Sequence, residues 1–126
     1  DALRLLHTYV HDPLQPVVAG AFAPDPRQAW LLSRSPQPGP AGDALVVLQD
    51  GSERTRIPTG GARPYGIVAA GGMAFLPGEV EHLRFDGATL HPFARSESTV
   101  DGDMGAYAAS ADGKLLAFAT LRSVQL

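Results

Sequence analysis

The histidines are the residues of this sequence whose spacing could support metal chemistry. His7 and His11 have the four-residue spacing that brings two histidines onto one face of a helix, where both can bind one zinc ion. On a strand, the same spacing separates two residues by about 13 Å, which is too far for one ion held about 2 Å from each nitrogen. No glutamate follows His7 to complete the zinc-hydrolase motif. We therefore predict no metal site at this pair.

A second histidine pair lies across a potential hairpin. A two-residue turn at Asp86-Gly87 would place His82 directly opposite His91, with about 5 Å between their Cβ atoms. That distance is short enough for a shared ligand, but apart from Glu81 no third ligand is evident. A half-exposed cross-strand pair is the commoner arrangement of two such side chains. We therefore predict no metal and no cofactor. His82 and His91 are the one weak candidate for a metal site.

Residues that could carry other chemistry are not arranged for it. The sequence has no Gly-x-Ser-x-Gly elbow, no phosphate-binding glycine loop and no EF-hand spacing. The run Asp101-Gly102-Asp103 resembles the start of a calcium loop, but apolar and aromatic side chains occupy the next ligand positions. Ser33 and Ser110 have no evident base partner. We predict no catalytic residue, and the sequence favours a protein that is not an enzyme.

The composition restricts the fold class. The chain has 126 residues, and its 14 glycines and 11 prolines are scattered along it. A helical domain needs several uninterrupted runs of about 10–12 residues or more, so an all-helical fold is excluded. Apolar residues at 44% and charged residues at 18% argue against a disordered chain. No run approaches the roughly 18 apolar residues of a membrane span.

Charge and cysteine content restrict the partners. The net charge is −3, and the 10 cations, all arginine except for one lysine, are spread thinly along the sequence. Proteins that bind nucleic acid usually gather basic residues on one face, so a nucleic-acid partner is not expected. The absence of cysteine excludes disulfides and thiolate chemistry, and it leaves cytoplasmic, periplasmic and secreted locations equally open.

An internal repeat changes the interpretation of the chain. Three segments share the pattern of an apolar strand, a tight turn and another apolar strand. Placing Leu31, Phe75 and Phe118 in register gives steps of 44 and 43 residues, close to the 40–45 residues of a four-stranded propeller blade. The segments are Val17–Ser33, Tyr65–Pro77 and Met104–Thr120.

The turns support a succession of hairpins. Asp-Gly and Gly-Gly between apolar runs favour two-residue hairpin loops, because these loops require positive φ. Two such loops would place Val68 opposite Phe75 and Tyr107 opposite Phe118. The four dipeptides are Asp50-Gly51, Gly71-Gly72, Asp86-Gly87 and Asp112-Gly113.

The pattern predicts about twelve short strands grouped into blades. The groups are a partial blade over 1–12, a blade over 16–61, a blade over 62–101 and a partial blade over 102–126. The predicted strands are Leu3–Leu6, Thr8–Val10, Val17–Ala23, Ala29–Ser33, Ala44–Gln49, Arg54–Pro58, Tyr65–Ala70, Met73–Leu76, Val80–Phe85, Thr89–Ala94, Gly105–Ser110, Leu115–Thr120 and Ser123–Leu126. Trp30 lies within this pattern and is predicted to be a core residue.

The third repeat resembles a known family. Its sequence SADGKLLAFAT, from Ser110 onwards, is similar to the Ser-Pro-Asp-Gly-Lys-x-Leu-Ala segment of WD-repeat and related bacterial propellers, with Ala111 in place of proline. The phrase RPYGIVA, which begins at Arg63, also resembles strand openings in bacterial propellers. No Trp-Asp pair ends a third strand and no Gly-His precedes a blade. The resemblance implies an all-β fold of about three propeller blades, each of four antiparallel strands; a compact barrel or sandwich is the alternative.

Three blades do not close a ring, because propellers use about 4–8. We therefore expect either a part of a larger propeller or copies that associate to complete one. In the usual propeller layout, loops from successive blades share one face, which suits binding of a protein or peptide partner by a scaffolding module. A propeller enzyme, the gating propeller of a hydrolase, and a chain without selected activity are the alternatives. The predicted binding face comprises His11, Asp12, Arg34, Arg63, Tyr65, Glu79, Asp101 and Asp103.

Overall fold

The protein is built from antiparallel β-sheets, as the computed structural model shows for residues 5, 7–11, 13–35, 42–95, 104–120 and 124–125. These residues contain no helix, so the prediction of an all-β fold is confirmed. Two sheets have four strands each, and the third has three strands within the described residues. Along each sheet the strands follow the order of the sequence. We call the three sheets the first, second and third sheet.

Most strand bounds agree closely with the sequence pattern; the exception is the predicted strand Tyr65–Ala70, which begins only at Val68. The first sheet contains β1 (Val17–Phe22), β2 (Gln28–Ser33), β3 (Ala44–Gln49) and β4 (Ser52–Pro58). The second contains β5 (Val68–Ala70), β6 (Met73–Leu76), β7 (Glu81–Phe85) and β8 (Leu90–Arg95). The third contains β9 (Met104–Ala109), β10 (Leu116–Thr120) and β11 (Val124–Gln125).

Three of the four predicted hairpins form in the predicted register, although residues 111–114 make a four-residue loop in place of the two-residue turn predicted at Asp112-Gly113. Val68 pairs with Phe75, and Tyr107 pairs with Phe118. The two residues between β3 and β4 have φ values of 51° and 83°, which the Asp50-Gly51 dipeptide tolerates because aspartate and glycine enter the left-handed region most readily.

The fourth predicted turn, at Asp86-Gly87, is wrong: the pairing of the two strands is shifted by two residues from the predicted register. Phe85 pairs with Leu90, not with Ala88. The reason is the Asp86 carboxylate, whose Oδ1 accepts hydrogen bonds from the N–H groups of Ala88 and Thr89, both at 2.8 Å. Asp86 therefore begins the turn instead of occupying its centre.

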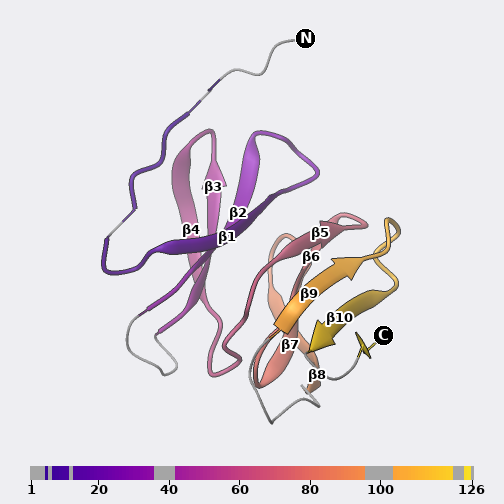
Figure 1. Cartoon of the computed structure of the whole chain (residues 1–126). Coiled ribbons are helices and arrows are strands. Elements are labelled where there is room, and N and C mark those ends of the chain that lie inside the picture. Colours follow the sequence, from indigo (N-terminus) through magenta and orange to yellow (C-terminus); the bar gives the residue numbers. More distant parts are fainter. Residues whose placement is uncertain are drawn as a thin grey trace.

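The N-terminal residues do not form the predicted strand. The described part of this segment, residues 5 and 7–11, has no strand pairing, so Thr8–Val10 is not a strand. The predicted strand Leu3–Leu6 lies mostly outside the described residues. The segment runs as an extended chain along one side of the first sheet (Figure 1).

The hydrophobic core lies between the first and second sheets. The Trp30 ring, which is fully buried, contacts the Phe85 ring edge-to-face with 5.1 Å between centroids. Its Nε1–H donates to Oε1 of Gln28 at 2.8 Å, so its polar group is satisfied. Burying each large side chain in such a cluster stabilises the fold by about 1.5–3 kcal/mol. The core members are Ala23, Trp30, Leu32, Leu45, Val47, Ala62, Ile67, Ala74, Leu76, Leu83 and Phe85.

Hydrogen bonding between the first two strands distinguishes the two faces of each sheet. In an antiparallel pair, hydrogen-bonded and non-hydrogen-bonded residue pairs alternate, and their side chains lie on opposite faces. The N–H of Ala23 donates to the carbonyl of Gln28 at 3.1 Å, so Trp30, two residues further on, also belongs to a hydrogen-bonded pair. We call the face with the hydrogen-bonded residues of the second strand the A face, and the opposite face the B face.

The core joins an A face to a B face. In the second sheet, the two-residue loop is flanked by the pair Ala70 and Met73, which hydrogen-bonds in such hairpins, so Ala74 and Leu76 lie on the B face. Trp30 and Leu32 on the A face of the first sheet pack against this B face. The two sheets therefore meet head to tail, through faces that are not equivalent.

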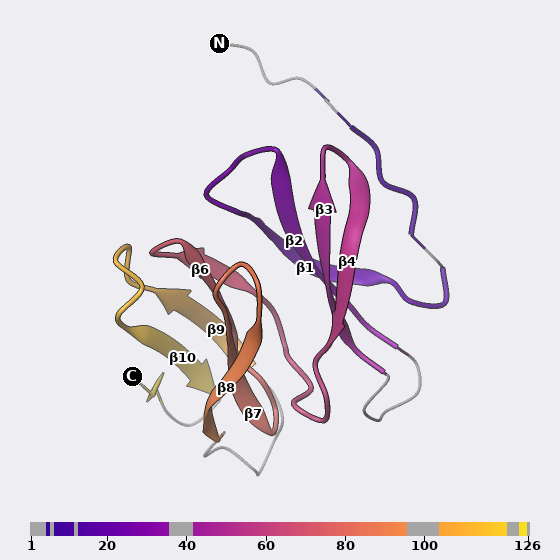
Figure 2. The ribbon, with the colours of Figure 1, turned by 180° about the vertical axis from the view of Figure 1, so that it is seen from behind.

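The second and third sheets meet in the same sense. The N–H of Ser110 donates to the carbonyl of Leu115 at 2.9 Å, which places Tyr107 on the B face of the third sheet. The Tyr107 hydroxyl lies directly against Gly66, where a Cβ would collide with it, and Gly71 N–H donates to the Ala111 carbonyl at 3.1 Å. Strand β5 contacts both β1 and β9, and the second sheet lies between the other two (Figure 1 and Figure 2).

Candidate functional site

Polar side chains gather at one end of the first two sheets. They come from three connections: the one between β2 and β3, the one between β4 and β5, and the one between β6 and β7. Hydrogen bonds and ion pairs link these connections to one another. We call this group the loop-end cluster. Its members are Arg34, Asp43, Arg63, Tyr65 and Glu79.

Arg34 holds the connection between the first and second sheets in place. Its Nη1 is 3.3 Å from Oδ2 of Asp43, and its Nη2 donates to the carbonyl of Pro64. The Asp43 carboxylate is buried, and its Oδ1 also accepts the N–H of Ser35 at 3.1 Å. The guanidinium therefore binds one side chain of its own sheet and one backbone group of the chain entering the second sheet. Arg34 and Asp43 are positioning residues.

Arg63 presents its charge at the surface from an unusual backbone conformation. Its φ is 51°, in the left-handed region that non-glycine residues seldom occupy. Its carbonyl accepts the N–H of Glu79 at 2.9 Å, and its Nε is 3.5 Å from Oε2 of Glu79. The two side chains are 38% and 48% exposed, so solvent reaches both charges. The N–H of Tyr65 donates to the Pro77 carbonyl at 2.7 Å, which adds a second tie between the two connections.

Four of the eight residues of the predicted binding face lie in this cluster: Arg34, Arg63, Tyr65 and Glu79. His11 is exposed on the N-terminal segment. Asp12, Asp101 and Asp103 lie outside the described residues. The sequence analysis missed Asp43, although an aspartate directly before a run of five apolar residues is a detectable signal, because a charge at that depth requires a partner.

The histidine pairing predicted across the second sheet is wrong. His82 pairs with Ala94, and His91 pairs with Arg84, because the turn begins at Asp86 as described above. His82 is buried, and its Nδ1 accepts the N–H of Gly78 at 3.1 Å.

The two histidines lie in different environments. Burial lowers the pKa of His82 below its ordinary value, whereas His91 is exposed, with its Nε2 2.7 Å from Oγ1 of Thr89. They therefore do not share a ligand. Across the part of the chain that the structure describes, no group of three or more histidine, cysteine, aspartate or glutamate side chains is placed to hold a metal ion.

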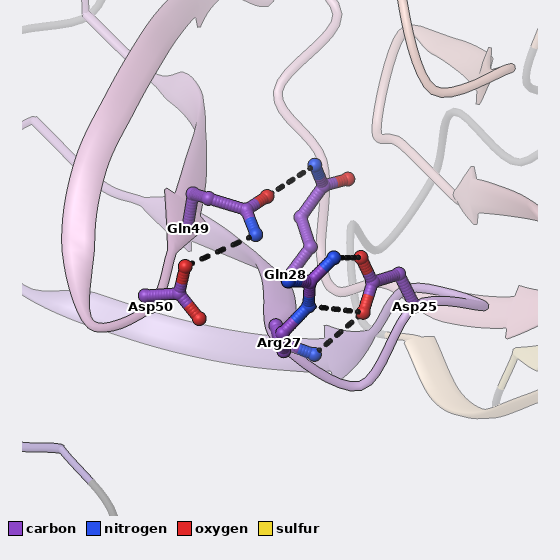
Figure 3. A network of polar contacts seen from close by, with 5 residues as sticks. All are labelled: Asp25, Arg27, Gln28, Gln49 and Asp50. Carbon is purple, nitrogen blue, oxygen red and sulfur yellow. Dashed lines mark hydrogen bonds and ion pairs between the residues drawn. The ribbon is translucent and has the colours of Figure 1, made fainter.

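A second polar group lies at the opposite end of the first sheet (Figure 3). Arg27 and Asp25 form an ion pair at 3.0 Å, and Gln28 donates to Gln49 at 3.2 Å. The backbone N–H of Asp50 donates to the Arg27 carbonyl at 2.8 Å, which ties the two hairpin loops together. We call this group the hairpin-end network.

A cleft of about 400 Å³ lies beside the hairpin-end network. It separates the N-terminal segment from the B face of the first sheet, so its floor is apolar and its rim carries the polar groups. The residues that line it are Leu5, His7, Tyr9, Phe22, Pro26, Arg27, Ala29, Leu48, Asp50 and Gly51.

Comparison with known proteins identifies no relative of this chain. No protein-family model matches the chain, and no curated protein and no solved structure is significantly similar to it. Within the described residues, no helix is both long enough and apolar enough to cross a membrane. The function is therefore inferred from the fold and from the loop-end cluster.

Proposed function

We propose that the chain is a β-propeller-type module without catalytic activity, and that it binds a protein or peptide partner at the loop-end cluster. The head-to-tail packing of three antiparallel sheets through their first strands supports the propeller interpretation, since propeller blades are four-stranded sheets that repeat around a central axis. Loops on such a rigid scaffold are common binding sites.

The observation that carries the proposal is the left-handed conformation of Arg63. A non-glycine residue in this region costs about 1–2 kcal/mol, and such strain concentrates at functional sites. Glycine would occupy the position without that cost, yet the residue present carries a charged side chain. Its backbone is held by the Glu79 N–H, so the strain serves to fix where the guanidinium emerges.

The chemistry of the cluster indicates what it would bind. Arg63 and Glu79 expose opposite charges side by side, and the half-buried Tyr65 lies next to them in the chain. Arginine and tyrosine are enriched among residues that dominate binding energy at protein interfaces. A partner segment with an acidic side chain for Arg63 and a basic one for Glu79 would match this surface. Arg34 and Asp43 lie beneath it and keep the connection in position.

The proposal is tested by site-specific photo-crosslinking followed by affinity measurement. A benzophenone amino acid replaces Tyr65 in one sample and the exposed Arg54 of β4 in another, and both are irradiated in cell extract. We expect a discrete crosslinked protein from position 65 only. Affinity for the captured protein is then measured for the unaltered chain, Arg63→Gly and Arg54→Ala.

The expected loss for Arg63→Gly is about tenfold or more, equal to about 1.4 kcal/mol, whereas Arg54→Ala retains full affinity. Because glycine tolerates the backbone conformation, a loss in this variant reports the side chain and not misfolding. Equal affinity of Arg63→Gly and the unaltered chain would show that the loop-end cluster is not the binding site.

A further inference from the structure

The B face of the first sheet is apolar, and among the described residues no other sheet packs against it. On β1, Val18 and Phe22 are 48% and 71% exposed. Beneath them on the same face lie Leu31, which is half-buried, and Val46 and Leu48, which are buried; these three pair with one another or with their neighbours across the sheet. In the second sheet, the B face is covered by the first sheet. In the third sheet, Tyr107 on the B face lies against Gly66, which precedes the second sheet.

The A face of the third sheet is the matching surface at the other end of the series. Ala108 and Ala117 pair with each other on this face, and Leu115 of the loop leading into β10 is 65% exposed. In the first sheet, the A face is the one that packs against the next sheet in the chain. Within the described residues, no sheet packs against the A face of the third sheet.

These two surfaces are related by the packing already present in the molecule. Trp30 lies two residues beyond the hydrogen-bonded pair at the β1–β2 loop, and Ala117 lies two residues beyond the equivalent pair of the third sheet. Phe85, which contacts Trp30, corresponds to Leu48 of the first sheet. Each is on the third strand and pairs with the second residue of the second strand, Ala74 for Phe85 and Ala29 for Leu48. The contact equivalent to Trp30 and Phe85 is therefore Ala117 against Leu48.

We infer that a second copy of this chain covers the B face of the first sheet with the A face of its third sheet. A head-to-tail contact between unlike faces produces either a closed ring or an open filament when it is repeated between copies. Two copies contribute six sheets, within the 4–8 blades that propellers use. Three copies would contribute nine, which exceeds that range. For the 126-residue chain, the expected assembly is thus a dimer with two identical contacts.

The N-terminal segment lies where the second copy would dock. Residues 7–11 run along this side of the first sheet without strand pairing. His7 lies against Gly51, and the cleft of about 400 Å³ is lined by this segment together with Phe22, Ala29 and Leu48 of the sheet. The apolar floor of the cleft is therefore not sealed by the segment. Docking would move the segment to the rim of the interface while Phe22 becomes buried. This inference rests on the proposed propeller arrangement, but it concerns a different surface from the loop-end cluster and does not depend on the proposed partner.

Cysteine crosslinking tests the docking directly, because the natural chain contains no cysteine. Phe22→Cys and Ala108→Cys each introduce one thiol at an exposed position, on the B face of the first sheet and the A face of the third. A short bis-maleimide is added to each variant alone and to an equal mixture. We expect a crosslinked dimer from the mixture, and from neither variant alone. Native mass spectrometry of the unaltered chain should show twice 13.2 kDa.

A charge substitution gives an independent measurement. Phe22→Glu should weaken the dimer at least about tenfold, because an interface core does not tolerate an unpaired charge. Val80→Glu, at a residue that is 52% exposed in the second sheet's β6–β7 connection, is the matched control and should leave the dimer unchanged. A monomeric native mass would overturn the inference. So would a dimer in which Phe22→Cys crosslinks to itself, because that contact joins two like faces.

Discussion

The two ends of the first two sheets use the same kinds of side chain in different ways. At the hairpin end, Asp25 pairs with Arg27 only two residues away, and both are well exposed. At the loop end, Arg34 reaches Asp43 nine residues away and also the backbone of the connection to the second sheet. The local pair shapes one turn, whereas the distant pair fixes one sheet relative to another. The histidines follow the same division, with His91 in a local exposed network and His82 buried near the loop end.

This difference predicts the largest effect for loss of the Asp43 carboxylate. Asp43→Ala leaves the guanidinium of Arg34 and the N–H of Ser35 without their buried acceptor. Removing one partner of a buried ion pair costs about 3 kcal/mol or more. We expect the midpoint of urea unfolding to fall accordingly. A loss below about 1 kcal/mol would mean that Asp43 behaves like an exposed pair, and the contrast between the two ends would fail.

The next effect concerns the pH dependence of stability. Burial lowers the pKa of His82 below its ordinary value of 6.5, so the unfolded chain binds a proton at a pH where the folded chain does not. The free energy of unfolding should therefore be constant above the ordinary pKa and fall as the pH drops below about 6.5. Urea titrations at intervals from pH 7.5 to 5.5 measure this slope.

The matched variants are His82→Asn and His91→Asn. Asparagine at position 82 keeps an acceptor for the Gly78 N–H but has no titrating group in this range, so most of the slope should vanish. His91→Asn is the control, because it removes a histidine from the exposed hairpin and leaves the buried His82 in place. If both variants retain it, another group is responsible and His82 is not the source of the acid sensitivity.

The local pair at the hairpin end predicts a much smaller effect. The pKa of the Asp25 carboxyl is lowered by its hydrogen bonds from the Arg27 side chain and backbone, but both side chains are in contact with water. Exposed ion pairs contribute little to stability. Asp25→Asn should therefore leave the urea midpoint close to that of the unaltered chain. The midpoint of this variant should also change little with salt concentration. A loss comparable with that of Asp43→Ala would show that the pair supports more than its own turn.

The sequence predicted the strands well because local chemistry decides most of their ends. Alternating apolar residues and the Asp50-Gly51 and Gly71-Gly72 dipeptides fix two hairpins almost without help from the rest of the fold. Asp86-Gly87 contains a similar dipeptide but forms a different turn, because the aspartate side chain accepts two backbone N–H groups instead of occupying the turn centre.

The loop-end cluster could be predicted only in part. The expected layout of loops brought Arg34, Arg63, Tyr65 and Glu79 together by their positions between strands. It did not reveal the depth of Asp43, which depends on how the connection from β4 packs over it. The left-handed backbone of Arg63 was also hidden, because no local sequence signal favours that conformation for arginine and it is held by bonds from a distant connection, such as that from the Glu79 N–H.

The left-handed conformation of Arg63 predicts only a small net change in stability when glycine replaces it. Arg63→Gly removes a strain of about 1–2 kcal/mol, but it loses an exposed ion pair worth about 0–1 kcal/mol and adds about 0.5–1 kcal/mol of chain entropy to the unfolded state. The net change should lie within about 1 kcal/mol of zero. Arg63→Ala loses the same side chain and keeps the strain, so it should be less stable than Arg63→Gly by about 1 kcal/mol. Urea unfolding of the two variants side by side measures this difference, since both lack the ion pair with Glu79. If alanine were as stable as glycine, Arg63 would not be strained, and the reason for placing the binding site at the loop end would be lost.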